Sequence, residues 1–198
     1  MSPPEPRGPR GKLATRRLAL ARRDALAAEE RAAASVAICD AANALLAQRV
    51  VPGAVVALYA AKGSEVDTAR IDAAARAAGL VVVYPRVIEG VRSLMFHGVT
   101  LDELAPTRFG LREPNADAPR VEVADIAAFV VPGLAFDRAG GRIGWGRGHY
   151  DATFAAASPS ALRIGLAFEC QLVEHVAPEP HDVALHILIT ELATYVVG

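Results

Sequence analysis

The sequence has few of the residues from which small proteins build covalent or metal-based frameworks. Only two cysteines, Cys39 and Cys170, occur among 198 residues. They show neither the paired spacing of a zinc motif nor the clustering of a disulfide framework. A chain of this length buries about 70% of its unfolded surface, so a hydrophobic core is enough to stabilise it. We therefore expect reduced, non-catalytic thiols and a cytoplasmic location.

An excess of charge of either sign and long hydrophobic runs are also missing. Lys and Arg number 21, and Asp and Glu number 22, which gives a formal net charge of -1. A nucleic-acid-binding protein would carry a basic surface, so no nucleic-acid partner is expected. The most apolar stretch, residues 127–136, is too short to span a membrane. Because hydrophobic residues make up 53% of the chain, a globular protein without a membrane partner is predicted.

Changes of pattern along the chain predict one α/β domain after a disordered, proline-rich tail at residues 1–11. Helices are expected at residues 12–28, 29–48, 64–78 and 149–157, the third beginning at a capping-box-like Ser64 and Asp67 pair. Strands are expected at residues 54–59, 80–84, 94–96, 109–111, 126–131, 162–168 and 186–190. The strand–helix–strand order of residues 54–84 predicts parallel pairing. The predicted fold of residues 12–198 is a three-layer α/β/α domain with a mostly parallel sheet and an N-terminal helical segment.

The segment from Val131 to Asp151 combines the residue types of a phosphate-binding site. It follows a predicted parallel strand, and open α/β sheets bind ligands at the carboxyl ends of such strands. Its alternating glycines 144, 146 and 148 let the backbone approach a ligand, and the helix that follows favours anions at its N-terminus. Arg142 and Arg147 suit phosphate oxygens. Asp151 is placed to hold a magnesium ion that bridges phosphates.

The same segment also allows interpretations other than a phosphate-binding site. A glycine-rich turn between a strand and a helix needs no ligand. The sequence contains no G-x-x-x-x-G-K-[ST] loop, and its glycines do not follow the dinucleotide fingerprint. No Ser-His-Asp or Cys-His arrangement is recognisable either. The combination of glycines, two arginines, aromatic residues and an acid at a strand end favours a site for polyphosphate.

The same segment resembles the pattern of a known family. Residues 132–151 are similar to P-G-L-x-F-D-x-x-G-x-R-[LI]-G-x-G-x-G-[aromatic]-Y-D of the 5-formyltetrahydrofolate cyclo-ligases, also called methenyltetrahydrofolate synthetases. Further similar segments occur in the family's order at residues 12–16, 65–68, 84–86, 109–114 and 187–191. The resemblance spans about residues 12–192.

The resemblance implies a ligase of folate and one-carbon metabolism. Such an enzyme uses ATP and Mg²⁺ to convert 5-formyltetrahydrofolate, with or without a polyglutamate tail, to 5,10-methenyltetrahydrofolate. ADP and phosphate are released, and the formyl oxygen is activated by phosphoryl transfer. Such chemistry needs charge neutralisation and alignment more than a protein nucleophile. By analogy with the family, a monomer is expected.

The resemblance also implies roles for individual residues. Glu65 matches the acid that holds the pterin, and Asp151 and Asp182 match the magnesium-associated acids. The implied catalytic residues are Arg142, Arg147 and Asp151. The implied ATP-binding set is Lys12, Arg16, Arg142, Ile143, Gly144, Trp145, Gly146, Arg147, Gly148, His149 and Tyr150. The implied folate-binding set is Ala60, Glu65, Trp145, Gly146, Arg147, Gly148 and His149.

Several of these residues also have a purely structural interpretation. Lys12 and Arg16, one helical turn apart, could belong to a solvated basic helix. Glu65 could be an acid in the first turn of a helix, where it would complement the helix dipole. Asp182 could cap the turn that leads into a strand.

The histidines include two departures from the family pattern. His149 stands where Tyr or Phe is common and adds a titratable group. His186 stands where many members have aspartate; it either weakens a magnesium site or is an ordinary residue at the surface or sheet edge. His97, His175 and His181 show no ligand-like grouping and are predicted to be structural or exposed.

Two other functions remain as alternatives. An α/β enzyme that acts on sugar phosphates or acyl-CoA would keep the anion site but should lack the Lys12, Arg16 and Glu65 matches. A nucleotide-binding module without catalysis would bind ATP and turn over no folate.

Overall fold

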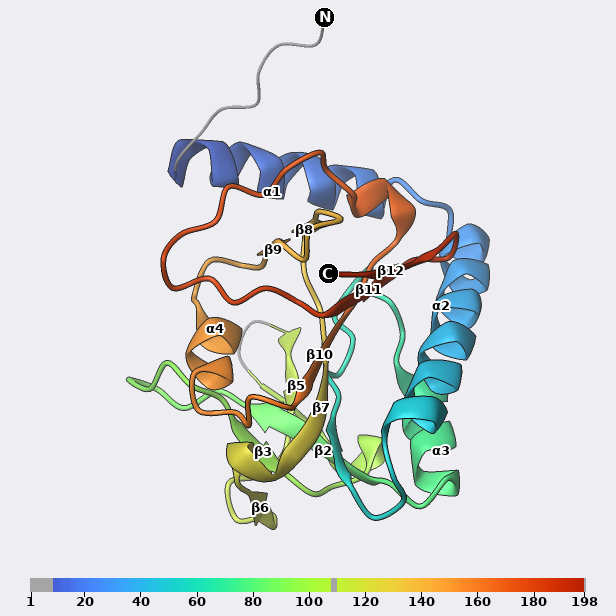
Figure 1. Ribbon diagram of the computed structural model, residues 1–198, viewed down its shortest axis with the longest axis vertical. Coiled ribbons are helices and arrows are strands. Elements are labelled where there is room, and N and C mark those ends of the chain that lie inside the picture. Colours follow the sequence, from blue (N-terminus) through green and yellow to red (C-terminus); the bar gives the residue numbers. More distant parts are fainter. Residues whose placement is uncertain (1–8, 108–109, 198) are drawn as a thin grey trace, which may run out of the picture.

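A mostly parallel sheet of eight strands runs through the structure, which is a computed structural model describing residues 9–107 and 110–197 (Figure 1). Its strands are β1 (Val55–Ala57), β2 (Val81–Arg86), β3 (Met95–His97), β6 (Arg120–Val121), β7 (Ile126–Val131), β10 (Leu162–Leu166), β11 (Ile187–Ile189) and β12 (Thr194–Val196). Their order is β12-β11-β10-β7-β1-β2-β3-β6. The five strands from β11 to β2 are parallel, and antiparallel strands pair at both edges. The predicted α/β class with a mostly parallel sheet is confirmed.

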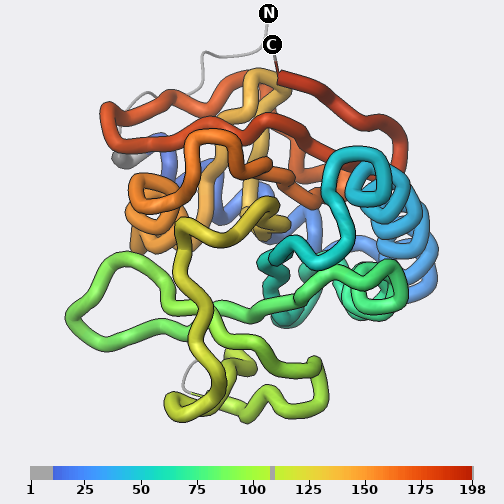
Figure 2. Tube along the Cα trace, turned by 60° about the horizontal axis from the view of Figure 1, so that its bottom comes forward, coloured from blue at the N-terminus to red at the C-terminus, as the bar shows by residue number. Residues whose placement is uncertain are grey.

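Helices cover both faces of the sheet. They are α1 (Pro9–Asp24), α2 (Ala28–Arg49), α3 (Ala69–Ala77) and α4 (His149–Phe154). Figure 2 shows α2 and α3 on one side of the strands and α4 on the other. Consecutive residues of β1 explain this layering, because Val56 packs in the cluster that includes α2 and α3, whereas Ala57 packs in the cluster that includes α4. No helix in the described ranges is long and apolar enough to span a bilayer.

Short elements complete the connections. They are η1 (Leu101–Glu103), β4 (Ala105–Pro106), β5 (Arg112–Glu113), η3 (Val123–Asp125), β8 (Ala135–Phe136), β9 (Arg142–Ile143) and η4 (Glu169–Gln171). Strands β8 and β9 form an antiparallel hairpin directly after β7. Buried Asp137 stabilises this hairpin, because its carboxylate accepts the backbone N–H groups of Ala139, Gly141 and Val176.

Helix α1 lies across the end of the sheet at which β7 leads into the β8–β9 hairpin (Figure 1). It packs against β8 and η4. Ala19 of α1 is buried against Ala135, Ile143 and Val176 in a small apolar cluster of its own. The first helix therefore covers the carboxyl end of a central parallel strand, where the sequence predicts the chemistry.

One predicted helix is shorter than expected, and this changes the setting of Glu65. The helix predicted at residues 64–78 begins only at Ala69. Side-chain hydrogen bonds hold the preceding residues in a loop, since Ser64 pairs with Arg23 and the Thr68 hydroxyl donates to the carbonyl of Tyr59. The predicted capping box at Ser64 is wrong, and so is the alternative that Glu65 is a first-turn helix acid.

Other bounds also differ from the prediction. Pro85 does not end its strand, because it lies beyond the residues of β2 that pair with β1 and instead faces Phe96 of β3. Residues 9–11 belong to α1 rather than to the predicted tail, and residues 1–8 lie outside the described part. The strand predicted at 109–111 lies partly outside that range, and the described residues 110–111 are not in a strand. Strand β12 was not predicted.

Candidate active site

Arg142 on β9 is the most buried cation of the glycine-rich segment. Its side chain is 7% exposed, and its guanidinium lies 3.4 Å from the carboxylate of Asp151 and 5.3 Å from the centre of the Tyr150 ring. Within the described residues, the buried Nε of Arg142 has no hydrogen-bond partner. An unpaired donor in a buried position is costly unless a ligand satisfies it. The guanidinium therefore fits an anionic ligand such as a phosphate group.

Helix α1 brings two further cations to the same place. The Nε of Arg16 donates to the carbonyl oxygen of Gly144 over 2.8 Å. Lys12 lies one turn earlier, with its side chain 12% exposed and its ammonium 2.8 Å from Asp182 and 3.3 Å from Glu179. These contacts exclude the alternative that Lys12 and Arg16 only form a solvated basic helix.

The glycine loop needs its glycines for both conformation and space. Gly146 has a φ of +89°, and a Cβ there would lie 3.1 Å from the guanidinium of Arg16. Gly148, with a φ of +67°, precedes α4. Positive φ is costly for residues with a side chain, so the loop favours glycine at both positions. Arg147 lies between them on the exposed part of the loop.

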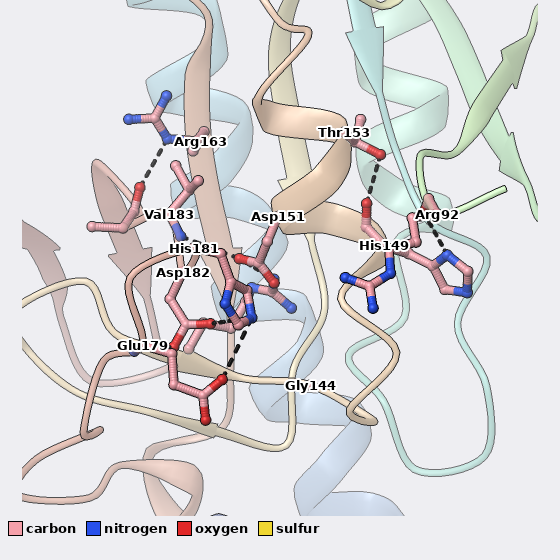
Figure 3. Close-up of polar contacts among 12 residues, drawn as sticks. Arg92, Gly144, His149, Asp151, Thr153, Arg163, Glu179, His181, Asp182 and Val183 are labelled. Atoms are coloured by element: carbon pink, nitrogen blue, oxygen red, sulfur yellow. Dashed lines mark hydrogen bonds and ion pairs between the residues drawn. The ribbon is translucent and has the colours of Figure 1, made fainter.

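The aromatic and apolar residues of the segment differ in what they can offer a ligand. Ile143 is buried in the apolar cluster with Ala19, so only its backbone is available. Tyr150 packs on Phe154 with ring centres 5.9 Å apart, and burial raises the pKa of the Tyr150 hydroxyl. His149 bonds through Nδ1 to the carbonyl of Arg92 over 2.7 Å (Figure 3). Its Nε2 is buried and has no partner within the described residues.

The two predicted magnesium-associated acids lie on neighbouring segments (Figure 3). The carboxylate of Asp151 accepts the backbone N–H of Val183, the residue after Asp182. Partial burial opposes ionisation of Asp182, but hydrogen bonds from Lys12 and from the backbone of Glu179 outweigh it and lower its pKa. The carboxylate of Asp182 is therefore expected to be ionised near neutral pH.

A cluster of possible metal ligands surrounds Asp182. One ligand atom each of Glu179, His181 and Asp182 can be chosen so that all lie within 4.8 Å of one another. The prediction that His181 has no ligand-like grouping is therefore wrong. Carboxylate oxygens suit Mg²⁺, so the donor chemistry of Asp151, Asp182 and Glu179 fits such an ion. The ammonium of Lys12 lies against two of these acids, so it would have to share them with a metal ion.

The acid Glu65 lies at a separate pocket of about 250 Å³. The pocket is lined by Ala60, Ala61, Gly63, Glu65, Asp67, Thr68, Leu101 and Arg112. Burial raises the pKa of Glu65, and the backbone N–H of Lys62, 2.9 Å from its Oε2, opposes that rise. The charge of Arg23 and a hydrogen bond from Trp145 also oppose it. The structure thus sets a desolvated carboxylate in the wall of a pocket.

Trp145 connects this pocket to the glycine loop. Its side chain reaches Glu65 by a hydrogen bond, while Gly144, its neighbour in the loop, accepts from Arg16. The ammonium of Lys62 lies 5.5 Å from the centre of the indole ring, and Trp145 remains 55% exposed. One loop therefore contacts both the cation cluster and the pocket.

The family model that matches the chain is described as the 5-formyltetrahydrofolate cyclo-ligase family, and it covers residues 9–191. The chain belongs to this family. A 5-formyltetrahydrofolate cyclo-ligase of Mycolicibacterium smegmatis is 39% identical over 87 residues, which are 43% of this chain and 45% of that protein. The chain thus spans about half the length of this relative. One of Escherichia coli K12 is 30% identical over 147 residues, 71% of this chain and 80% of that protein.

Two solved structures of methenyltetrahydrofolate synthetases share the fold. The protein from Mycoplasma pneumoniae superposes with a TM-score of 0.75 at 23% identity, covering 91% of this chain and 98% of that chain. The protein from Aquifex aeolicus gives a TM-score of 0.78 at 24% identity, covering 94% and 92%. These similarities confirm the predicted fold, and the match to the family model confirms the predicted family.

His186, which departs from the family pattern, and Cys39, which was predicted to be a non-catalytic thiol, both make structural contacts. His186 accepts the backbone N–H of Arg163 at Nδ1, and its Nε2 lies 2.7 Å from the guanidinium of the same residue. It is not part of the cluster around Asp182. Burial raises the pKa of Cys39 to about 11, which agrees with its predicted lack of nucleophilic character.

Four residues of the candidate site were not predicted from the sequence. Arg112 lines the pocket of Glu65, and Arg23 lies buried behind that acid. Glu179 and His181 join Asp182. The short spacing of Glu179, His181 and Asp182 could have revealed their cluster. The helical spacing of Lys12, Arg16 and Arg23 could have placed Arg23, but not its exposed neighbour Arg22, on the face of the other two cations.

Proposed function

We propose that this protein is an ATP- and Mg²⁺-dependent 5-formyltetrahydrofolate cyclo-ligase that produces 5,10-methenyltetrahydrofolate. One observation carries the proposal: the glycine loop contacts Arg16 through the carbonyl of Gly144 and interacts with the carboxylate of Glu65 through Trp145. One loop would therefore bring together a phosphate donor and a heterocycle with a hydrogen-bond-donor edge. Family membership supports the same reaction.

The nucleotide is assigned to the cation cluster. Lys12, Arg16 and Arg142 surround a loop whose glycines allow close approach of phosphate groups. The unpaired Nε of Arg142 supplies a donor for a phosphoryl oxygen. Arg147 is proposed to add charge from the exposed part of the loop. These fixed cations would stabilise the charge that develops on the transferred phosphoryl group.

Magnesium is assigned to Asp151 and Asp182, with Glu179 as a further oxygen donor. When bound, the ion would neutralise phosphate charge and align the β- and γ-phosphates. Because Lys12 already pairs with Asp182 and Glu179, it would hold these acids in place before the nucleotide arrives.

Folate is assigned to the pocket of Glu65. An ionised carboxylate can accept two hydrogen bonds from the ring N–H and amino group of the pterin. Ala60 lines this pocket, and Trp145 lies at Glu65 with a largely exposed ring. His149, close to the loop's end, has a free Nε2 lone pair when Nδ1 carries the proton toward Arg92. The pocket thus offers acceptors to a donor-rich ring.

The reaction follows from the weakness of a formamide as an electrophile. The formyl oxygen attacks the γ-phosphorus, the bond from phosphorus to the β,γ-bridging oxygen breaks, and ADP leaves. The N10 amine then attacks the activated formyl carbon. The carbon–oxygen bond breaks, phosphate leaves, and N10 loses its proton to give the methenyl bridge. Alignment and charge stabilisation are all that the chain must supply.

An absorbance assay tests this function. The protein is mixed with Mg²⁺, ATP and 5-formyltetrahydrofolate, and the near-ultraviolet band of the methenyl product is followed. We expect ATP-dependent product from the wild type and a loss of about a hundredfold or more for Asp151→Ala, which removes a proposed metal ligand. Asp117→Ala is the matched control, because Asp117 is an exposed acid that is not among the proposed site residues. This variant should retain full activity.

Each contrary outcome points to a different function. A folded wild-type protein that binds ATP and makes no product would be a nucleotide-binding module. One that binds neither ATP nor folate would reject the proposal as a whole.

A further inference from the structure

One stripe of helix α1 carries three cations of different burial. Lys12, Arg16, Ala19 and Arg23 follow the spacing of a single helical face. The first two reach Asp182 and Gly144. Arg23, at the other end of the helix, is only 2% exposed and lies beyond the residues that reach Asp182 and Gly144. One end of this face therefore lies at the proposed nucleotide site, and the other end carries the buried Arg23.

Arg23 binds two segments that are far apart in the sequence. Its Nε donates to the hydroxyl of Ser64 over 2.9 Å, and a terminal nitrogen donates to the carbonyl of Gly133 over 3.4 Å. Ser64 also donates to Asp24, so the loop before Glu65 is bonded to two consecutive residues of α1. Both direct acceptors of Arg23 are neutral groups. A buried guanidinium needs an anion nearby to offset its desolvation. Two carboxylates are available: Asp24, which accepts from Ser64, and Glu65, which directly follows Ser64 and whose pKa the Arg23 charge lowers.

We propose that Arg23 is a positioning residue for Glu65, which it holds against helix α1 so that the pterin acid and the nucleotide cations sit on one rigid element. This inference rests on the proposed function and deepens it, because it concerns how the folate half of the same site is set up. Arg23 touches neither substrate; it acts through Ser64 and Glu65.

The charges around Glu65 make the proposal measurable. Arg23 faces it from α1, Lys62 from its own loop and Trp145 from the glycine loop. Tyr59, after β1, and Tyr150, on α4, also interact with it. Asp67, before α3, and Arg112, on β5, line the same pocket. Burial raises the pKa of Glu65, while the positive charges of Arg23 and Lys62 oppose the rise. Removal of the Arg23 charge should raise this pKa further and leave less Glu65 ionised in mildly acid solution.

The single tryptophan of the chain supplies a readout that needs no turnover. Because Trp145 is hydrogen-bonded to Glu65, its fluorescence should change as Glu65 takes up a proton. The fluorescence of the ligand-free protein is titrated with pH for the wild type and for Arg23→Gln, Arg23→Lys, Ser64→Ala and Glu65→Gln. Arg22→Gln is the matched control, since Arg22 is the exposed neighbour on the same helix.

The expected results distinguish the effect of the Arg23 charge from the effect of its hydrogen bond to Ser64. Glu65→Gln should abolish the transition, and Arg23→Gln should move it to higher pH. Arg23→Lys should restore most of the wild-type midpoint because it keeps the charge. Ser64→Ala leaves the charge in place and should leave the midpoint near that of the wild type. Arg22→Gln should behave like the wild type throughout.

Kinetics then tests the positioning role. We expect Arg23→Gln and Ser64→Ala to raise the KM for 5-formyltetrahydrofolate by about tenfold, with the KM for ATP nearly unchanged. An unmoved fluorescence midpoint in Arg23→Gln, or equal effects on both KM values, would overturn the proposal. A wild type without turnover would reject the proposed function instead, and the fluorescence titration would still decide the role of Arg23.

Discussion

At the scale of single residues, Arg142 shows how burial and an unpaired donor together indicate a ligand. We expect Arg142→Lys to weaken binding of a non-hydrolysable ATP analogue by about tenfold or more, because lysine keeps the charge but loses the planar donor fork. Isothermal titration calorimetry in the presence of Mg²⁺ measures the change. Arg120→Lys, at an exposed ion pair on β6, is the control. Equal affinity in both variants would remove Arg142 from the nucleotide site.

His186 gives a residue-scale prediction about stability. Its burial and the charge of Arg163 lower its pKa in the folded state. The unfolded chain therefore binds the extra proton more strongly, and the free energy of unfolding should fall as the pH drops below the ordinary histidine value. This loss should be smaller in His186→Gln. Urea unfolding at several pH values tests it, with His175→Gln, at a histidine whose side chain is 67% exposed, as the control.

At the scale of elements, the glycine loop and helix α1 depend on each other. Gly146→Ala should cost about 1–2 kcal/mol of stability from positive φ. It should also shift the guanidinium of Arg16, which would lie only 3.1 Å from the new Cβ. Gly53→Ala shares a positive φ but has nothing within 4 Å of the new Cβ. Both variants should unfold at lower urea concentration, whereas only Gly146→Ala should raise the KM for ATP. Equal KM values would contradict the coupling.

Element bounds were predicted best where burial and local pattern agree. The strand expected at residues 126–131 coincides with β7, whose residues are apolar throughout and buried in the middle of the sheet. The helix expected at 64–78 begins late, because the hydrogen bonds of Ser64 and Thr68 to distant segments replace a local cap. A capping pattern describes only neighbours in the sequence, so it could not anticipate those partners.

At the scale of the whole molecule, β7 joins the two halves of the sheet. Phe129 is fully buried there and packs edge-on against Phe96 and Phe154, with ring centres 5.7 Å and 5.5 Å away. Phe129→Ala should cost about 3–5 kcal/mol in the free energy of unfolding, since it removes these contacts and leaves a cavity. Urea denaturation measures this cost. Val51→Ala, at a side chain that is 71% exposed, should change stability little.

The sequence by itself determined the α/β class, the central strands, the glycine loop and the family, because each of these depends on residues close together in the chain. Only the tertiary structure decided the partners within the site. Lys12 meets Asp182 across 170 positions, and Arg23 meets Ser64 across 41. Such pairs depend on how α1 packs across the end of the sheet. Burial then gave Arg23 and Glu65 their electrostatic coupling, because helical spacing puts Arg23 on the face of Lys12 and Arg16 but does not say which segment packs against that end of the helix.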